Sequence, residues 1–178
     1  MSDILNAAAA IEEYLIGLRR WFHCNPELSS AEENTVVRIA QELDALGIRY
    51  VNVPEGGILA FLGDENRGRT VLLRADMDAL PMAETAEIPY RSQNPGAMHA
   101  CGHDAHVTCL LGGARLLKAR QAELAGEVRL VFQPAEEVGG GTGPFLESGV
   151  TQGVYRSFGL HCAPDVPAGT VGLKPGLN

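Results

Sequence analysis

The chain has 178 residues, of which 46% are hydrophobic and 20% are charged. A chain of this length can bury roughly 70% of the surface that it exposes when unfolded, so a folded globular domain is predicted. The formal net charge of −8 argues against nucleic acid or an anionic membrane as partner, because an acidic surface repels phosphate groups. The expected partner is therefore a small molecule or another protein.

The amino-terminal segment carries three acidic side chains within residues 1–15 and lacks the basic region and long apolar core of a secretory signal. No apolar run approaches the roughly 20 residues that a membrane-spanning helix needs. We therefore expect a cytoplasmic protein. Its four cysteines should stay as thiols unless a metal ion binds one of them.

Two helices are predicted at the start of the chain. Apolar residues spaced one, three and four apart predict an amphipathic helix over residues 4–22. The apolar face of a second helix covers residues 36–46 and ends at Gly47. A capping box is expected at its start, because Ser29 and Ser30 are each followed three residues later by a glutamate.

The rest of the chain alternates predicted strands with predicted helices. Strands are expected at IRYVNV, GGILAFLG, RTVLLRADMD, GEVRLVFQP and YRSFGLH, and the third is apolar enough to be covered on both faces. A helix follows MHACGHDAH, with Asp104 as its expected N-cap, and a helical turn is expected at GPFLESG. This alternation predicts an α/β layered domain.

Four polar clusters lie at or just beyond predicted strand ends, where open α/β sheets bind their ligands. They are RADMDALP, HACGHDAH, FQPAEEVGGG and GLHCAP. Cys101 and His103 lie two residues apart, so an extended backbone would direct both side chains to one side. A thiolate and an imidazole are ligands that zinc prefers. Two ligands do not define a site, however, and an isolated cysteine or histidine is often structural.

The Glu136–Glu137 pair follows an apolar strand and precedes three glycines. Neighbours in an extended chain point to opposite sides, so one carboxylate could bind metal while the other takes a proton from water. Most such pairs are solvated acidic loops, but this position favours function. His161, at the end of a further predicted strand, is another candidate ligand, with a buried structural histidine as the alternative.

Asp76 and Asp78 end the third predicted strand and should point the same way. They could ligate a metal ion or accept hydrogen bonds from the ring N–H groups of ligating histidines, and we favour the second role for at least one of them. His99, Asp104 and His106 are expected to orient ligands or cap the helix rather than to coordinate the metal.

The segments RADMDALPM, MHACGHDAHVTCLLGGARLL, VRLVFQPAEE and FGLHCAP occur in this order, after LRRWFHCNPELSSAEENT. Together they closely resemble the aminoacylase-like metal-dependent amidohydrolases. These include hippurate hydrolase, N-acetyl-amino-acid and N-acetyldiaminopimelate deacetylases, and plant auxin-conjugate hydrolases. The resemblance covers essentially the whole chain. It implies a layered zinc-exopeptidase-like catalytic domain, with a central mixed sheet flanked by helices.

The resemblance also implies roles for individual residues. Cys101, His103, Glu137 and His161 would be ligands of a centre that holds two divalent ions when complete, of zinc, manganese, cobalt or nickel. Glu136 would be the general base. The implied reaction is hydrolysis of the amide bond of an N-acyl amino acid, with hippurate-like or N-acetyl substrates, by a metal-activated water.

Members of the family are considerably longer than this chain. Residues 1–178 would form a truncated, amino-terminal part of the catalytic domain, without the inserted lid and dimerisation domain and without the carboxyl-terminal half that supplies a last histidine ligand. We therefore expect exposed edge strands, an exposed apolar surface and self-association through it.

Two alternatives stay open at this stage. The chain could be a catalytically inactive fragment that keeps the fold and partial metal binding, and that serves as an interaction module or is a gene remnant. Alternatively, Cys101 could be a nucleophile activated by His103, which would leave the paired glutamates and His161 without a role.

Overall fold

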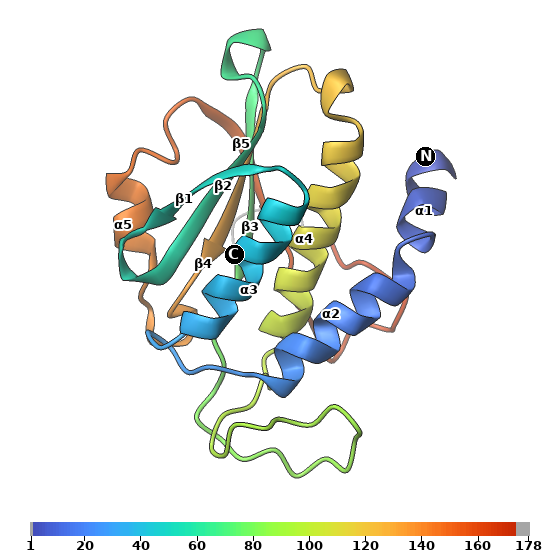
Figure 1. Cartoon of the computed structure of the whole chain (residues 1–178), viewed down its shortest axis with the longest axis vertical. Helices are drawn as coiled ribbons and strands as arrows, with labels where there is room; N and C mark the ends of the chain where they lie inside the picture. Colours follow the sequence, from blue (N-terminus) through green and yellow to red (C-terminus); the bar gives the residue numbers. More distant parts are fainter. Residues whose placement is uncertain (1, 174–178) are drawn as a thin grey trace.

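The computed structural model describes residues 2–173 and shows a five-stranded mixed sheet flanked by helices (Figure 1), so the predicted fold class is confirmed. The helices are α1 (Ser2–Ala9), α2 (Glu12–Cys24), α3 (Glu33–Ala45), α4 (His103–Ala119) and α5 (Thr142–Glu147). The strands are β1 (Arg49–Val53), β2 (Gly57–Gly63), β3 (Thr70–Asp76), β4 (Glu127–Gln133) and β5 (Val154–Gly159). None of the helices in this part of the chain is both long enough and apolar enough to cross a bilayer.

The strand order is β1-β2-β4-β3-β5. β1, β2 and β4 are joined in antiparallel pairs, whereas β3 runs parallel to both β4 and β5. The carboxyl ends of β3, β4 and β5 therefore meet at one edge of the sheet, which places the loops that follow them side by side.

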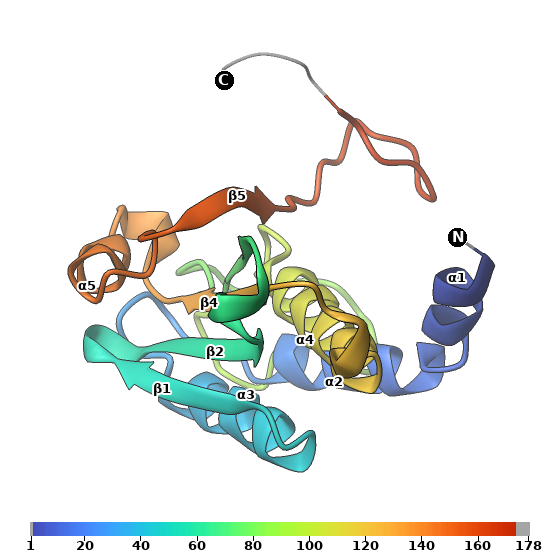
Figure 2. The ribbon, with the colours of Figure 1, turned by 90° about the horizontal axis from the view of Figure 1, so that it is seen from above.

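The strands alternate their side chains between two apolar layers, as the period of two in a strand requires. On β2, Ile58 and Leu62 pack with α2, α3 and α4 on one face, whereas Leu59 packs with α5 on the other. On β4, Leu130 and Val131 divide in the same way. Figure 2 shows the sheet edge-on, with α2, α3 and α4 on one side and α5 on the opposite side.

The single amino-terminal helix predicted over residues 4–22 is interrupted. α1 ends at Ala9, and the backbone leaves helical geometry at Ile11, with φ −111° and ψ 13°. This break lets α2 turn and pack along α4 (Figure 1). The apolar period continues through the break, which is why the sequence pattern does not reveal it.

The predicted capping box at Ser29 and Ser30 is wrong. The N-cap of α3 is Glu32, and its side chain makes no cap hydrogen bond. Instead, the Ser29 hydroxyl donates to Asp78 Oδ2 at 2.7 Å, and Glu32 Oε1 accepts the backbone N–H of Ala135 at 2.7 Å. The side chains that the local pattern assigned to a cap therefore bind partners outside the helix instead.

The assignment of Asp104 as an N-cap is also wrong, because α4 begins at His103 after Gly102. Similarly, β5 ends at Gly159, so His161 lies two residues beyond the strand rather than at its end. β5 is an edge strand that is largely exposed to solvent, and Phe158 keeps 54% of its surface exposed.

Candidate metal centre

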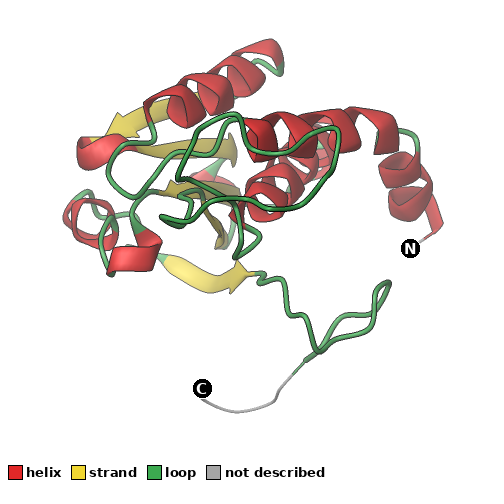
Figure 3. Ribbon diagram, turned by 90° about the horizontal axis from the view of Figure 1, so that it is seen from below, coloured by secondary structure: helices red, strands yellow, loops and turns green. Residues whose placement is uncertain are grey.

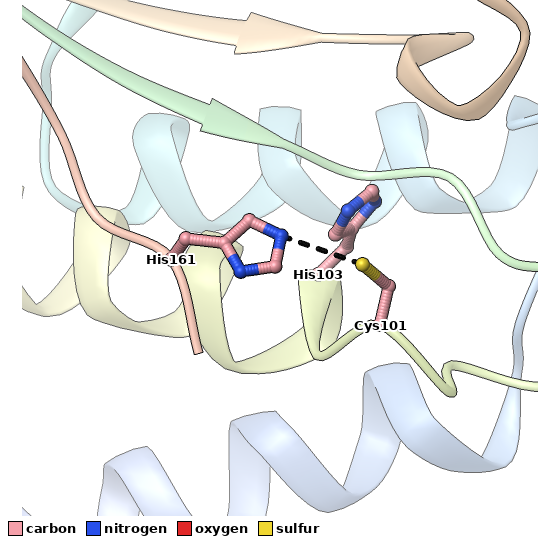
Figure 4. Close-up of side chains that lie close together, drawn as sticks. All are labelled: Cys101, His103 and His161. Atoms are coloured by element: carbon pink, nitrogen blue, oxygen red, sulfur yellow. Dashed lines mark hydrogen bonds between the residues drawn. The ribbon is translucent and has the colours of Figure 1, made fainter. Parts of the chain in front are cut away.

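The loops after β4 and β5 meet the start of α4 at the carboxyl edge of the sheet, which Figure 3 shows from below. Three groups of potential ligand atoms share His103, and the atoms of each group lie within 4.8 Å of one another. The first group adds Cys101 and His161, the second adds Glu136 and Glu137, and the third adds Asp76 and His106. Figure 4 shows Cys101 and His103 at the start of α4, with His161 approaching from the segment after β5. Cys101 Sγ lies 3.4 Å from His161 Nε2. The structure thus brings together all five residues that the sequence singled out as ligands or base.

The imidazole of His103 is fixed with one nitrogen toward the cluster. Its side chain is fully buried, and Nδ1 donates to Asp78 Oδ1 at 3.2 Å. The other nitrogen, Nε2, has no hydrogen-bond partner and lies 3.6 Å from Glu137 Oε1, which is also buried and unpartnered. A buried polar atom without a partner costs about 1–3 kcal/mol. A divalent cation between a neutral imidazole and a carboxylate would satisfy both atoms, so these residues fit a metal ion.

The two glutamates do not lie on an extended segment, so the reasoning that placed them on opposite sides is wrong. Ala135 has φ 55° and is followed by a 3-10 turn over Glu136–Val138. This turn brings Glu136 Oε2 to 3.8 Å and Glu137 Oε1 to 3.6 Å from His103 Nε2. Both carboxylates therefore face the same imidazole, and Glu136 is the more exposed of the two.

Asp78 connects the imidazole to the glutamate turn. Besides the His103 ring, it accepts the Ser29 hydroxyl at 2.7 Å and the backbone N–H of Glu137 at 3.0 Å, both at Oδ2. Burial disfavours the charged carboxylate, but the hydrogen bonds from His103, Ser29 and Glu137 outweigh burial and lower the pKa of Asp78 to about 2. Asp78 thus makes the contact to a histidine ring that the sequence favoured for at least one aspartate of the pair.

The carboxylates give the cluster a negative potential. Burial would lower the pKa of His103, but the hydrogen bond to Asp78 and the charges of Asp76 and Glu137 raise it overall. Burial, followed by the Glu137 carboxylate, raises the pKa of the Cys101 thiol to about 12. A thiol with this pKa is protonated at neutral pH, so the nucleophile alternative finds no support. A metal ion, by contrast, would be attracted to the cluster and would itself ionise the thiol.

Asp76 does not hydrogen-bond to a candidate ligand. Its Oδ1 lies 2.6 Å from His106 Nδ1, and its Oδ2 accepts from Arg74 at 2.6 Å. His106 in turn accepts the backbone N–H of Cys162 at its Nε2, at 2.8 Å.

Asp104 and His99, which are expected to orient ligands or cap the helix, have other surroundings in the structure. The Asp104 carboxylate faces α2, where it lies 2.9 Å from Arg19 Nε and 2.7 Å from His23 Nδ1. His99 is buried and makes no side-chain hydrogen bond to any residue that the structure describes, and burial lowers its pKa to about 4. Neither side chain hydrogen-bonds to a candidate ligand within residues 2–173.

A buried polar network that no sequence pattern indicates lies behind α4. His23 Nε2 lies 3.1 Å from Glu84 Oε1, while its Nδ1 contacts Asp104, so His23 joins α2, the loop after β3 and α4. Glu84 also accepts the backbone N–H of Ser92. These residues are far apart in the sequence and share no spacing, so no local signal identifies the network.

Comparison with known proteins identifies the family. The profile of peptidase family M20/M25/M40 matches residues 72–176. N-acetylcysteine deacetylase of Bacillus subtilis is 44% identical over 172 residues, which cover 96% of this chain and 45% of that protein. IAA-amino acid hydrolase ILR1-like 5 of Arabidopsis thaliana is 46% identical over 166 residues, which cover 93% of this chain and 38% of that protein.

A solved structure shows the same fold. The Bacillus subtilis YXEP protein, described as a dinuclear metal-binding peptidase from the M20 family, superposes with a TM-score of 0.89 at 44% identity, covering 94% of this chain and 48% of that one. The chain thus spans less than half the length of these relatives. With the profile matched over more than half of its residues, the chain belongs to peptidase family M20/M25/M40.

Proposed function

We propose that this chain is the amino-terminal part of the catalytic domain of a metal-dependent amidohydrolase that cleaves N-acyl amino acids. The observation that carries the proposal is the pair of buried, unpartnered atoms, His103 Nε2 and Glu137 Oε1, that face each other 3.6 Å apart. The relatives named for N-acetylcysteine and for IAA-amino acids support the substrate class, because both names denote an acyl group joined to an amino acid.

Cys101, His103, Glu137 and His161 are the proposed ligands of divalent metal ions, two in a complete site. Mixed sulfur, nitrogen and oxygen ligands suit zinc, manganese, cobalt or nickel. The small-molecule substrate would approach from the open side, where His161 is exposed.

A bound divalent ion would supply Lewis-acid polarisation of the substrate carbonyl and a lowered pKa for water. Glu136 is the proposed general base. Its side chain is 38% exposed, with Oε2 only 3.8 Å from His103 Nε2, so it borders both the ligand cluster and solvent. Its carboxylate takes the proton of the attacking water as the carbon–oxygen bond forms, and returns that proton to the departing amine as the carbon–nitrogen bond breaks.

Paired substitutions test this division of roles. We expect Glu136→Gln to keep its metal, measured by mass spectrometry, and to lose turnover of N-acetyl and benzoyl amino acids by about 10²–10⁴-fold. Glu137→Gln should lose metal as well as turnover, because it removes a charged ligand. Wild-type turnover in Glu136→Gln would contradict the assignment of the base.

The exposed apolar edge of β5 favours a second candidate, a catalytically inactive module that associates with another protein or with itself. Phe158, in β5, and Leu160, just beyond its end, keep 54% and 62% of their surfaces exposed. Metal binding without turnover, together with self-association in size-exclusion chromatography, would favour this candidate. The cytoplasmic location stays a prediction from the sequence.

A further inference from the structure

The segment that carries His161 makes few hydrogen bonds to the rest of the described chain. Within residues 161–173, only the N–H of Cys162 makes a backbone hydrogen bond to the rest of the described chain, and its acceptor is His106 Nε2 at 2.8 Å. The other polar contacts to the rest of the described chain are weak ones through sulfur, from Cys162 to the Gly102 carbonyl at 3.9 Å and between Cys101 and His161 at 3.4 Å. Within the segment, His161 Nδ1 donates to the Cys162 carbonyl at 2.7 Å, so the backbone at Cys162 also orients the His161 ring. The position of His161 therefore depends strongly on the His106 contact.

His106 is itself held in one orientation. It is 4% exposed and lies on the first turn of α4, and because its Nε2 accepts a backbone N–H, its proton must be on Nδ1. Nδ1 donates to Asp76 Oδ1 at 2.6 Å, and Arg74 contacts the other carboxylate oxygen of Asp76 at 2.6 Å. The His106 ring also packs edge-to-face against the His161 ring, with centroids 4.8 Å apart.

We infer that His106 is a positioning residue, which uses the Cys162 N–H to hold His161 against Cys101 and His103. Asp76 sets the required tautomer of His106. The inference rests on the proposed function, because it takes His161 as a metal ligand.

The competing role for His106 is that of a ligand. One of its nitrogens lies within 4.8 Å of potential ligand atoms of Asp76 and His103. Both of its nitrogens are already engaged, however, one by the Asp76 carboxylate and the other by the Cys162 N–H. Coordination would have to break one of these bonds, so the geometry favours positioning.

Two matched substitutions separate the two nitrogens. His106→Gln places an amide oxygen near the position of Nε2 and keeps an acceptor for Cys162. His106→Asn places its amide near Nδ1, so it keeps the donor to Asp76 but loses that acceptor. We expect His106→Asn to weaken zinc binding about 10–100-fold and His106→Gln to restore most of the affinity. In the metal-free chain, amide exchange at Cys162 should accelerate in His106→Asn alone. Thermal unfolding identifies any variant that fails to fold.

A cycle with His161→Ala tests whether His106 acts through His161, using zinc alone as the probe. We expect His106→Asn to cause no further loss of zinc affinity when His161 is already alanine. If His106→Asn reduces zinc affinity equally with and without His161→Ala, or leaves amide exchange at Cys162 unchanged, the positioning role of His106 is overturned while the proposed function stands. Wild-type zinc affinity in His161→Ala would instead contradict the proposed function, and the inference would fall with it.

Discussion

Asp78→Asn should destabilise the metal-free protein and weaken its metal binding. The Asp78 side chain is fully buried, and its pKa is lowered from 3.8 to about 2. Since one pKa unit corresponds to about 1.4 kcal/mol, the charged form stabilises the folded state by about 2 kcal/mol at neutral pH. An asparagine amide would also place a donor opposite the His103 ring N–H, at the position of Oδ1, or opposite the Glu137 N–H, at the position of Oδ2, at a cost of about 1–3 kcal/mol. The expected loss is about 2–4 kcal/mol in the free energy of unfolding.

Urea unfolding in the presence of a chelator measures this loss. Asp165→Asn, in an exposed loop, is the matched control and should leave the midpoint unchanged. Because the folded-state pKa of Asp78 is lowered, its stabilisation is complete above about pH 4 and is lost as the pH falls toward 2. The difference in the free energy of unfolding between wild type and Asp78→Asn should therefore stay constant from about pH 7 to 5 and narrow below about pH 4. Equal urea midpoints for Asp78→Asn and the control would contradict this role of Asp78, as would a midpoint difference between wild type and Asp78→Asn that widens on acidification.

Three further predictions follow from other contacts. The hydrogen bond to Asp104 raises the pKa of buried His23 above 6.5, so the stabilisation from this ion pair is full below about pH 6.5 and is lost as the pH rises through the raised pKa. His23→Gln should remove this pH dependence from the urea midpoint. Parallel pH profiles for wild type and His23→Gln would contradict the prediction. Gly102→Ala should lower both the melting temperature and the zinc affinity, because Gly102 has φ 94° and an added Cβ would lie 2.9 Å from the Cβ of Cys162; unchanged zinc affinity would show that this close approach is dispensable. Phe158→Glu should reduce self-association at the β5 edge in size-exclusion chromatography, and a monomeric wild type would disprove the expected association.

The secondary structure could be predicted because burial imposes a period on each element. Strands β2, β3 and β4 carry apolar runs whose residues are mostly buried or half-buried, and α4 buries one face, so both types of element are visible in the sequence. The ends of the elements were less predictable, because side chains that could cap a helix instead hydrogen-bond to residues far away in the sequence. Glu32 bonds to Ala135, 103 residues away, rather than capping α3. The break at Ile11 lies within an unbroken apolar pattern and could not be seen.

The location of the candidate centre could be predicted because it follows from topology. Loops after parallel strands meet at one edge, so the clusters after β4 and β5 had to lie near each other whatever their detailed geometry. The local conformations were different from those assumed, since the Glu136–Glu137 pair lies on a 3-10 turn and His103 on a helix. The partners of Asp76 and Asp104 could not be predicted either, because each carboxylate contacts both a buried histidine and a partly exposed arginine from other positions in the sequence.

In the proposed centre, Cys101, His103, Glu137 and His161 bind a shared cation, and His103 belongs to both groups of ligand atoms that these residues form. X-ray absorption at the zinc edge, on wild type and Cys101→Ser loaded with one equivalent of zinc, tests this shared binding most directly. We expect a sulfur shell at about 2.3 Å and imidazole nitrogen at about 2.0 Å in wild type, with the sulfur shell lost in Cys101→Ser. A zinc spectrum without sulfur in wild type, or one that Cys101→Ser leaves unchanged, would contradict the proposed centre.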